Sequence, residues 1–148
     1  MKIGIATILY NEKPLEEVAR YVSGLGYQMV ELGAWKGANH FDLDACLGDR
    51  SYGRKLKGTL AGYGLEISGL SNHLMGQLVL SGDDPTMADW APGRQGAERV
   101  EYASRELTKT AQAAAELGVP VVNGFVGSPV WDSWYIWPPE HEQLYEQG

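Results

Sequence analysis

Four short apolar runs divide the chain, and each of them predicts a β-strand. They cover residues 2–8, 28–33, 65–70 and 119–124. The runs are rich in Val, Ile and Leu and show little alternation with polar residues, which is typical of strands in a parallel sheet. The pattern therefore predicts four parallel strands.

The segments between these runs carry apolar residues at helical spacing. The three predicted helical regions are residues 15–25, 42–63 and 97–117. Within the second region, Gly48 and Gly53 are expected to interrupt the helix, because glycine is a poor helix former. A long stretch of turn-forming residues separates the third strand from the last helix.

Alternating strands and helices predict an α/β fold with right-handed crossovers. A doubly wound sheet and part of a (β/α)₈ barrel both fit this order. The turn after the first strand, "ILYNEKP", lacks the glycine motifs that bind nucleotide phosphates, so a nucleotide-binding fold is not supported. We expect residues 1–148 to form one domain of parallel β/α units, a TIM half-barrel of about four strands.

Composition narrows the possible partners. The chain has 12 basic and 19 acidic side chains and a net charge of −7, which disfavours binding to nucleic acid or to an anionic membrane. Its one cysteine, Cys46, cannot form an internal disulfide and is expected to face the core. No apolar run reaches the roughly 18–20 residues of a membrane helix. We expect a cytoplasmic protein, because the N-terminus has no cleavage site.

Two longer stretches resemble a known family. They are "GLSNHLMGQLVL" (residues 69–80) and "AAAELGVPVVNGFVGSPVW" (residues 113–131), and the segments "IGIATILY" and "VELGAW" fit the same pattern. They are similar to the sugar phosphate isomerase/epimerase family of xylose isomerase-like TIM barrels. The resemblance covers nearly the whole chain and the N-terminal half of the family's barrel.

The resemblance implies that a divalent metal such as Mn²⁺ or Mg²⁺ acts in the complete barrel. In the family, Glu, Asp and His residues of the later strands hold it, and those positions would lie beyond Gly148. We therefore expect no metal site from this chain alone. The three histidines, at 40, 73 and 141, have no zinc-type spacing either. The implied partners are a small carbohydrate and another copy or a second chain that completes the barrel.

The implied activity is sugar isomerisation or epimerisation by proton transfer next to a carbonyl. Fold alone does not select the reaction. A dehydratase or lyase acting on oxidised sugars or inositols is an alternative chemistry. A non-catalytic carbohydrate-binding or assembly module is the alternative from another class of protein.

Candidate site residues follow the carboxyl ends of the predicted strands, where barrel enzymes build their active sites. The catalytic candidates are His73 and Glu31, because an imidazole or a carboxylate can move a proton near neutral pH. Trp rings cover the C–H faces of sugars, and Asn, Ser and His bond their hydroxyls. The substrate-binding candidates are Trp35, His40, Asn72, Asn123, Ser128, Trp131 and Trp134. Structural hydrogen bonds and helix packing are the competing interpretations.

An open four-stranded sheet would leave two strand edges unpaired. Its inward face would also lack an opposite wall. The apolar side chains expected on that face are Ile3, Ile5, Val30, Ile67 and Val121. We therefore expect the chain to form an oligomer or to require a second polypeptide.

Overall fold

A computed structural model describes residues 1–128, and its contacts define two compact units. The first unit contains Met1–Asn72 and Thr108–Asn123. The second contains His73–Leu107 and, among the described residues, 124–128. Trp131 and Trp134 lie outside the described residues.

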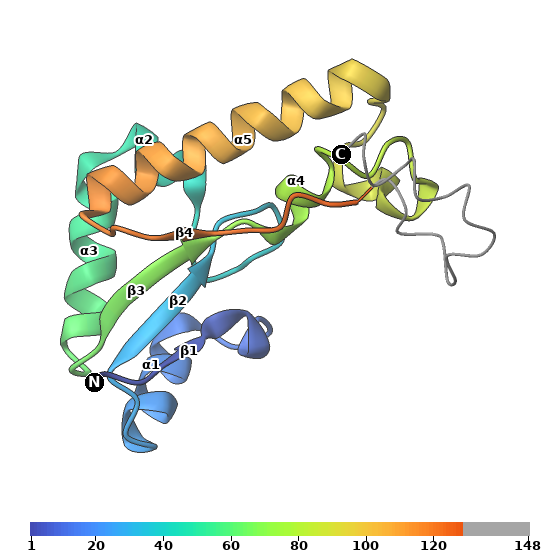
Figure 1. Cartoon of the computed structure of the whole chain (residues 1–148). Helices are drawn as coiled ribbons and strands as arrows, with labels where there is room; N and C mark the ends of the chain where they lie inside the picture. Colours follow the sequence, from blue (N-terminus) through green and yellow to red (C-terminus); the bar gives the residue numbers. More distant parts are fainter. Residues whose placement is uncertain (129–148) are drawn as a thin grey trace. The chain divides into compact units, whose positions relative to one another are not determined.

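The first unit contains a four-stranded sheet in the order β1-β2-β3-β4 (Figure 1). The strands are β1 (Gly4–Ala6), β2 (Met29–Gly33), β3 (Glu66–Ser71) and β4 (Val122–Asn123). Each neighbouring pair is parallel. The predicted α/β class and the four parallel strands are confirmed, although β1 and β4 are shorter than their apolar runs.

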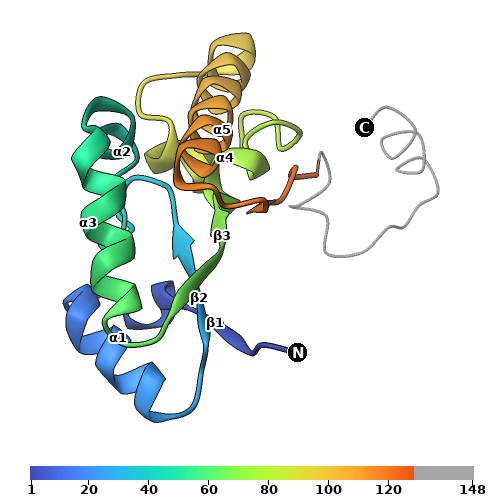
Figure 2. The same cartoon turned by 90° about the vertical axis from the view of Figure 1, so that its left-hand side faces the viewer.

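Helices of the first unit cover one face of this sheet. They are α1 (Leu15–Gly24), α2 (Leu43–Gly48), α3 (Arg50–Ala61) and the last part of α5 (Gly96–Leu117). A short 3₁₀ helix, η1 (Thr7–Tyr10), follows β1. Figure 2 shows α1 and α3 on the same side of the strands.

The predicted break at Gly48 is confirmed, and the predicted break at Gly53 is wrong. The side chain of Asp49 accepts a hydrogen bond from the backbone nitrogen of Ser51 and so caps the start of α3. Gly53 lies inside α3, where a β-carbon would approach Leu117 Cδ2 to 2.8 Å. Gly53 thus lies where α3 packs closely against the Leu117 side chain, and it does not form a turn.

The core of the first unit lies between the sheet and its helices. Val30, Leu32 and Leu70 are fully buried there, and Cys46 is buried as expected. Ile5 and Ile67 also pack against this core. The expectation that Ile5, Val30 and Ile67 face inward is therefore wrong. Strand residues alternate between the two faces of a sheet, and these three belong to the set that points toward the helices.

The second unit has a small core of its own. Its elements are α4 (His73–Gln77), the 3₁₀ helix η2 (Pro85–Trp90) and the first part of α5. The buried core residues are Met75, Leu78, Met87, Ala91 and Ala103. Helix α4 was not predicted, since five residues are too few to show a helical period.

A buried arginine organises the turn before α5. The Nη1 atom of Arg99 donates to the carbonyl oxygens of Gly82, at 2.9 Å, and Asp84, at 3.3 Å. The backbone nitrogen of Gly96, at the start of α5, donates to the Asp83 carboxylate at 2.7 Å. These bonds fix the stretch that the sequence describes only as irregular.

No helix within residues 1–128 has the length and apolar content needed to cross a bilayer.

Candidate functional site

The site is on the face of the sheet opposite the helices. Val30 and Leu32 of β2 are fully buried in the helix-facing core. Successive strand side chains point to opposite faces, so Glu31 projects from the other face. Glu31 is partly buried and lies near the carboxyl end of β2.

A hydrogen bond joins Glu31 to a residue 92 positions away. Asn123 Nδ2 donates to Glu31 Oε2 at 2.5 Å. Glu31 belongs to β2 and Asn123 to β4, with β3 between them. Strands two places apart are separated by about 9–10 Å, so both side chains reach across β3.

Gly69 of β3 leaves this path open. A β-carbon at position 69 would lie 3.6 Å from Asn123 Nδ2 and 3.3 Å from the carbonyl oxygen of Val121. A branched side chain would extend farther along the same path. The tighter of the two contacts is with the Val121 carbonyl oxygen, so glycine allows β4 to lie close to β3 beside the Glu31–Asn123 bond.

An irregularity in β3 sets which residue lies beside Glu31. Val30 pairs with Ile67, but Glu31 pairs with Gly69, so Ser68 is an extra residue in β3. The hydroxyl of Ser68 donates to the carbonyl oxygen of Val30 at 3.1 Å. This β-bulge places a glycine beside the carboxylate, where a regular register would place a serine.

Trp35 folds back onto the same face of the sheet. A β-carbon at Gly33 would lie 3.0 Å from two carbons of the Trp35 ring. Gly33 is two residues after Glu31 on β2, so both positions share one face. The indole is therefore near the carboxylate, and the first unit brings together three predicted residues: Glu31, Trp35 and Asn123.

Two residues that support Glu31 were not predicted from the sequence. Thr7 is buried, and its hydroxyl donates to the carbonyl oxygen of Glu31 at 3.2 Å. Gly69 opens the path described above. A threonine after a strand and a glycine within one carry no distinctive signal in a single sequence.

His40 and Asn72 are in the interior of the first unit. His40 is 6% exposed, and its Nε2 lies 2.8 Å from the carbonyl oxygen of Lys13. Asn72 is fully buried, and its Nδ2 donates to Ala34 O at 3.0 Å and to Thr110 Oγ1 at 2.9 Å. Both side chains therefore hold loops and helices in place, and their contact with a substrate stays a prediction.

His73 and Ser128 belong to the second unit. His73 begins α4, and its ring packs against Phe125 with centroids 4.7 Å apart and planes tilted by 33°. Ser128 is half-buried. Their roles in catalysis and in substrate binding stay predictions.

Within residues 1–128, no three His, Cys, Asp or Glu side chains gather closely enough to hold a metal ion. Asn123 accompanies Glu31, but an amide and one carboxylate are a poor ligand set for a catalytic divalent cation. The described residues thus do not fit a metal centre by themselves.

This geometry defines a parallel β/α sheet of the barrel type, with its candidate site at the carboxyl ends of the strands. The solved structures with similar folds include a D-psicose 3-epimerase crystallised in the presence of D-fructose, at a TM-score of 0.56 and 12% identity. They also include a D-psicose 3-epimerase with D-tagatose from Clostridium cellulolyticum H10, at a TM-score of 0.51 and 16% identity.

The alignments cover most of this chain but less than half of each epimerase. The first covers 97% of this chain and 44% of the epimerase, and the second covers 84% and 37%. No protein-family profile matches the sequence, and no curated protein matches it. At such identities the likeness establishes the fold alone, and it agrees with the expected TIM-barrel type.

Replacing Asn72 by Ala tests its interior role. Asn72→Ala should lower the free energy of unfolding by about 2–4 kcal/mol, because two buried acceptors lose their donor. Gln28→Ala is the control, since Gln28 is an exposed amide and should change stability by less than about 0.5 kcal/mol. Urea unfolding followed by circular dichroism measures both, and equal effects would contradict the assignment.

Proposed function

We propose that this chain forms part of a cytoplasmic sugar isomerase or epimerase. The observation that carries the proposal is the Glu31–Asn123 pair at the carboxyl ends of β2 and β4. Barrel enzymes place their chemistry at this end of the sheet. The similar folds of two D-psicose 3-epimerases support a carbohydrate as the ligand.

Glu31 is the proposed proton carrier of the first unit. Isomerising or epimerising a sugar begins with removal of a proton from the carbon next to the carbonyl. A carboxylate held in one orientation can accept that proton efficiently, because little freedom is lost in the transition state. Asn123 supplies this orientation by its bond to Oε2.

The neighbouring residues suit a sugar ring or chain. Gly33 and Gly69 place no side chain on the surface beside Glu31, and the indole of Trp35 offers a flat apolar face. Sugar C–H groups pack well on such rings. His73 is proposed as a second proton-handling residue, and Ser128, Trp131 and Trp134 as further substrate contacts. A divalent metal of the complete barrel would polarise the carbonyl.

Glu31→Gln should remove the proton carrier and keep the shape of the side chain. In the complete barrel, we expect turnover of a ketose to fall by about 10²–10⁴-fold. The measurement is incorporation of deuterium from D₂O at the carbon next to the carbonyl of D-fructose, followed by proton NMR.

Glu66→Gln is the matched control. Glu66 begins β3 at the opposite end of the sheet, and its carboxylate pairs with Lys2 at 2.5 Å. Its loss should leave exchange nearly unchanged. Equal losses in the two variants would refute the role of Glu31, and saturable sugar binding without any exchange in the unmodified protein would indicate a binding module.

His73→Ala tests the second proton carrier. If the imidazole transfers a proton, exchange in the complete barrel should fall by about 10²–10⁴-fold. The fold should persist, because His73 starts a five-residue helix and is not part of the described core clusters. A thermal melt of the variant monitors folding. Unchanged exchange would refute a role of His73 in proton transfer.

We also propose that further parallel strands pair with β1 and β4 in the functional protein. Both are edge strands, and Ile3, Val121 and Val122 beside them are 56%, 43% and 39% exposed. Unpaired edges with exposed apolar residues favour association. The chain alone should therefore sediment at micromolar concentration as a species larger than one chain.

Val122→Lys should weaken this association, because a lysine on an edge strand opposes pairing. Leu25→Lys is the control, since Leu25 follows α1 and is 58% exposed. Sedimentation equilibrium measures both variants. A compact, cooperatively melting monomer, or an equal effect of the two lysines, would overturn the proposal.

A further inference from the structure

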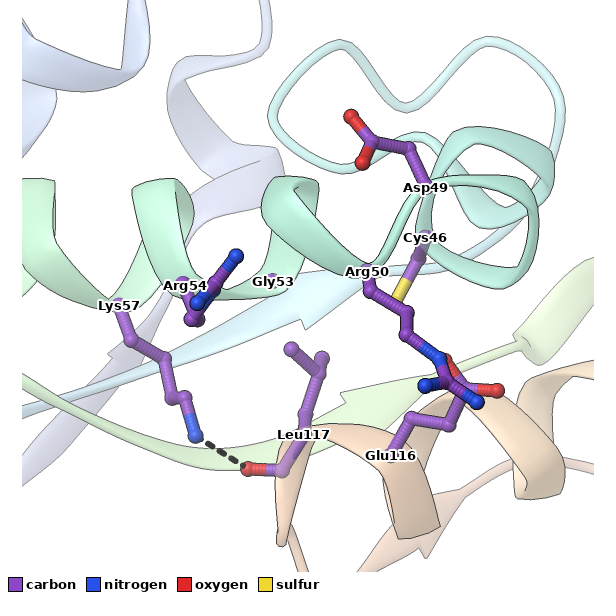
Figure 3. Close-up of a pocket in the computed structure, with 8 residues that line it drawn as sticks. All are labelled: Cys46, Asp49, Arg50, Gly53, Arg54, Lys57, Glu116 and Leu117. Atoms are coloured by element: carbon purple, nitrogen blue, oxygen red, sulfur yellow. Dashed lines mark hydrogen bonds between the residues drawn. The ribbon is translucent and has the colours of Figure 1, made fainter.

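A cavity on the helix-bearing side of the first unit carries an unusual concentration of positive charge. Its volume is about 340 Å³, and it lies between the end of α2, one face of α3 and the end of α5. Figure 3 shows Arg54 and Lys57 on α3 and the side chain of Arg50 extending toward Glu116 of α5. Glu31 is on the opposite face of the sheet, so this cavity is separate from the candidate site.

The basic residues are spaced to share one side of the helix. Arg50, Arg54 and Lys57 follow one another at intervals of four and three residues, which aligns them on one face of α3. Residues 50–57 hold four of the 12 basic side chains of an acidic chain, and no acidic one. The carboxylates that line the cavity are Asp49 and Glu116.

Asp49 is engaged in capping α3. Its Oδ1 accepts from the backbone nitrogen of Ser51 at 2.7 Å, and its Oδ2 accepts from the Ser51 hydroxyl at 2.8 Å. These two bonds hold the pKa of the Asp49 carboxyl below its usual value. Both oxygens of Asp49 are therefore engaged by Ser51, while its negative charge also attracts Arg54.

Lys57 is partly engaged, and the two arginines are not. Lys57 Nζ donates to the carbonyl oxygen of Leu117 at 3.1 Å, which uses one of its three hydrogens. This bond accounts for Lys57 as a cap on the end of α5. The guanidinium groups of Arg50 and Arg54 form no ion pair and no hydrogen bond with the described residues. Helix capping thus leaves two guanidinium groups at the cavity unexplained.

The volume of the cavity indicates a small ligand. Sites for small molecules typically measure about 300–1,000 Å³, so 340 Å³ suits a compact metabolite. Gly53 lies between Arg50 and Arg54 along the helix and adds no side chain to the lining. Guanidinium groups bind phosphate oxygens through paired N–H donors.

We propose that this cavity binds a small phosphorylated molecule through its phosphoryl group, with Arg50, Arg54 and Lys57 as the cationic partners. The proposal stands independently of the activity proposed for Glu31. It gives the chain a second ligand site, between helices on the helix-bearing side of the sheet, that can be occupied whether or not a sugar is bound at the inner face.

The test is a titration of the 148-residue chain at constant low ionic strength, followed by calorimetry. Inorganic phosphate, glucose 6-phosphate and glucose are the three probes. We expect saturable binding of both phosphates, tighter binding of glucose 6-phosphate and no binding of glucose. Absence of saturable phosphate binding would overturn the proposal, and equal affinities for phosphate and glucose 6-phosphate would overturn its claim of a metabolite site.

Arg54→Gln and Lys55→Gln form a matched pair on the same helix. Arg54 lines the cavity and Lys55 does not, both are exposed, and each substitution removes one positive charge. Arg54→Gln should weaken phosphate binding by about 10-fold or more, and Lys55→Gln by less than about 2-fold. Equal weakening would indicate diffuse attraction and refute a defined site. Thermal melts should show both variants folded, since neither residue is in the core.

Discussion

The hydrogen bond from Asn123 to Glu31 crosses β3 beside Gly69, and this contact between distant strands organises the polar groups on the inner face of the sheet. The bond spans β3, and a β-carbon at Gly69 would lie 3.6 Å from the Asn123 amide. The extra residue Ser68 puts glycine, rather than serine, beside Glu31. Parallel pairing then brings two residues from distant parts of the sequence to one edge of the sheet.

The two faces of this sheet serve different purposes. Val30, Leu32 and Leu70 point toward the helices and form the core that stabilises the unit. The other face carries Glu31 and Asn123 and is interrupted by glycine at 69. Apolar burial on one side supplies most of the stabilisation. The opposite face is thus free to carry polar groups, which must be hydrogen-bonded when they are partly buried.

The sequence was sufficient for the four strands, because each lies in a distinct apolar run. It was also sufficient for the main helices, because their apolar residues recur at helical spacing. It was insufficient wherever a contact distant in sequence decides the structure. Gly53 appears as a helix breaker until the packing against Leu117 is known. The buried backbone partners of His40 and Asn72 were likewise not predictable, because Lys13 and Ala34 are distant from them in the sequence and come together with them only in the fold. Glu31 and Trp35 were recognisable because both follow from the position of one strand, whereas the pairing of Glu31 with Asn123 was not.

The geometry also constrains which chemistry the first unit can perform alone. Isomerisation can return a proton to a neighbouring carbon on the same side of the sugar, so one oriented carboxylate suffices in principle. Epimerisation must return the proton to the opposite side of the same carbon, which needs a second proton carrier or a movement of the substrate. In the first unit, Glu31 is the carboxylate with an oriented bond on the inner face. A second carrier would have to be a group other than Glu31. Under the proposed function, the choice between isomerisation and epimerisation would thus depend on a second proton carrier, and not on Glu31 itself.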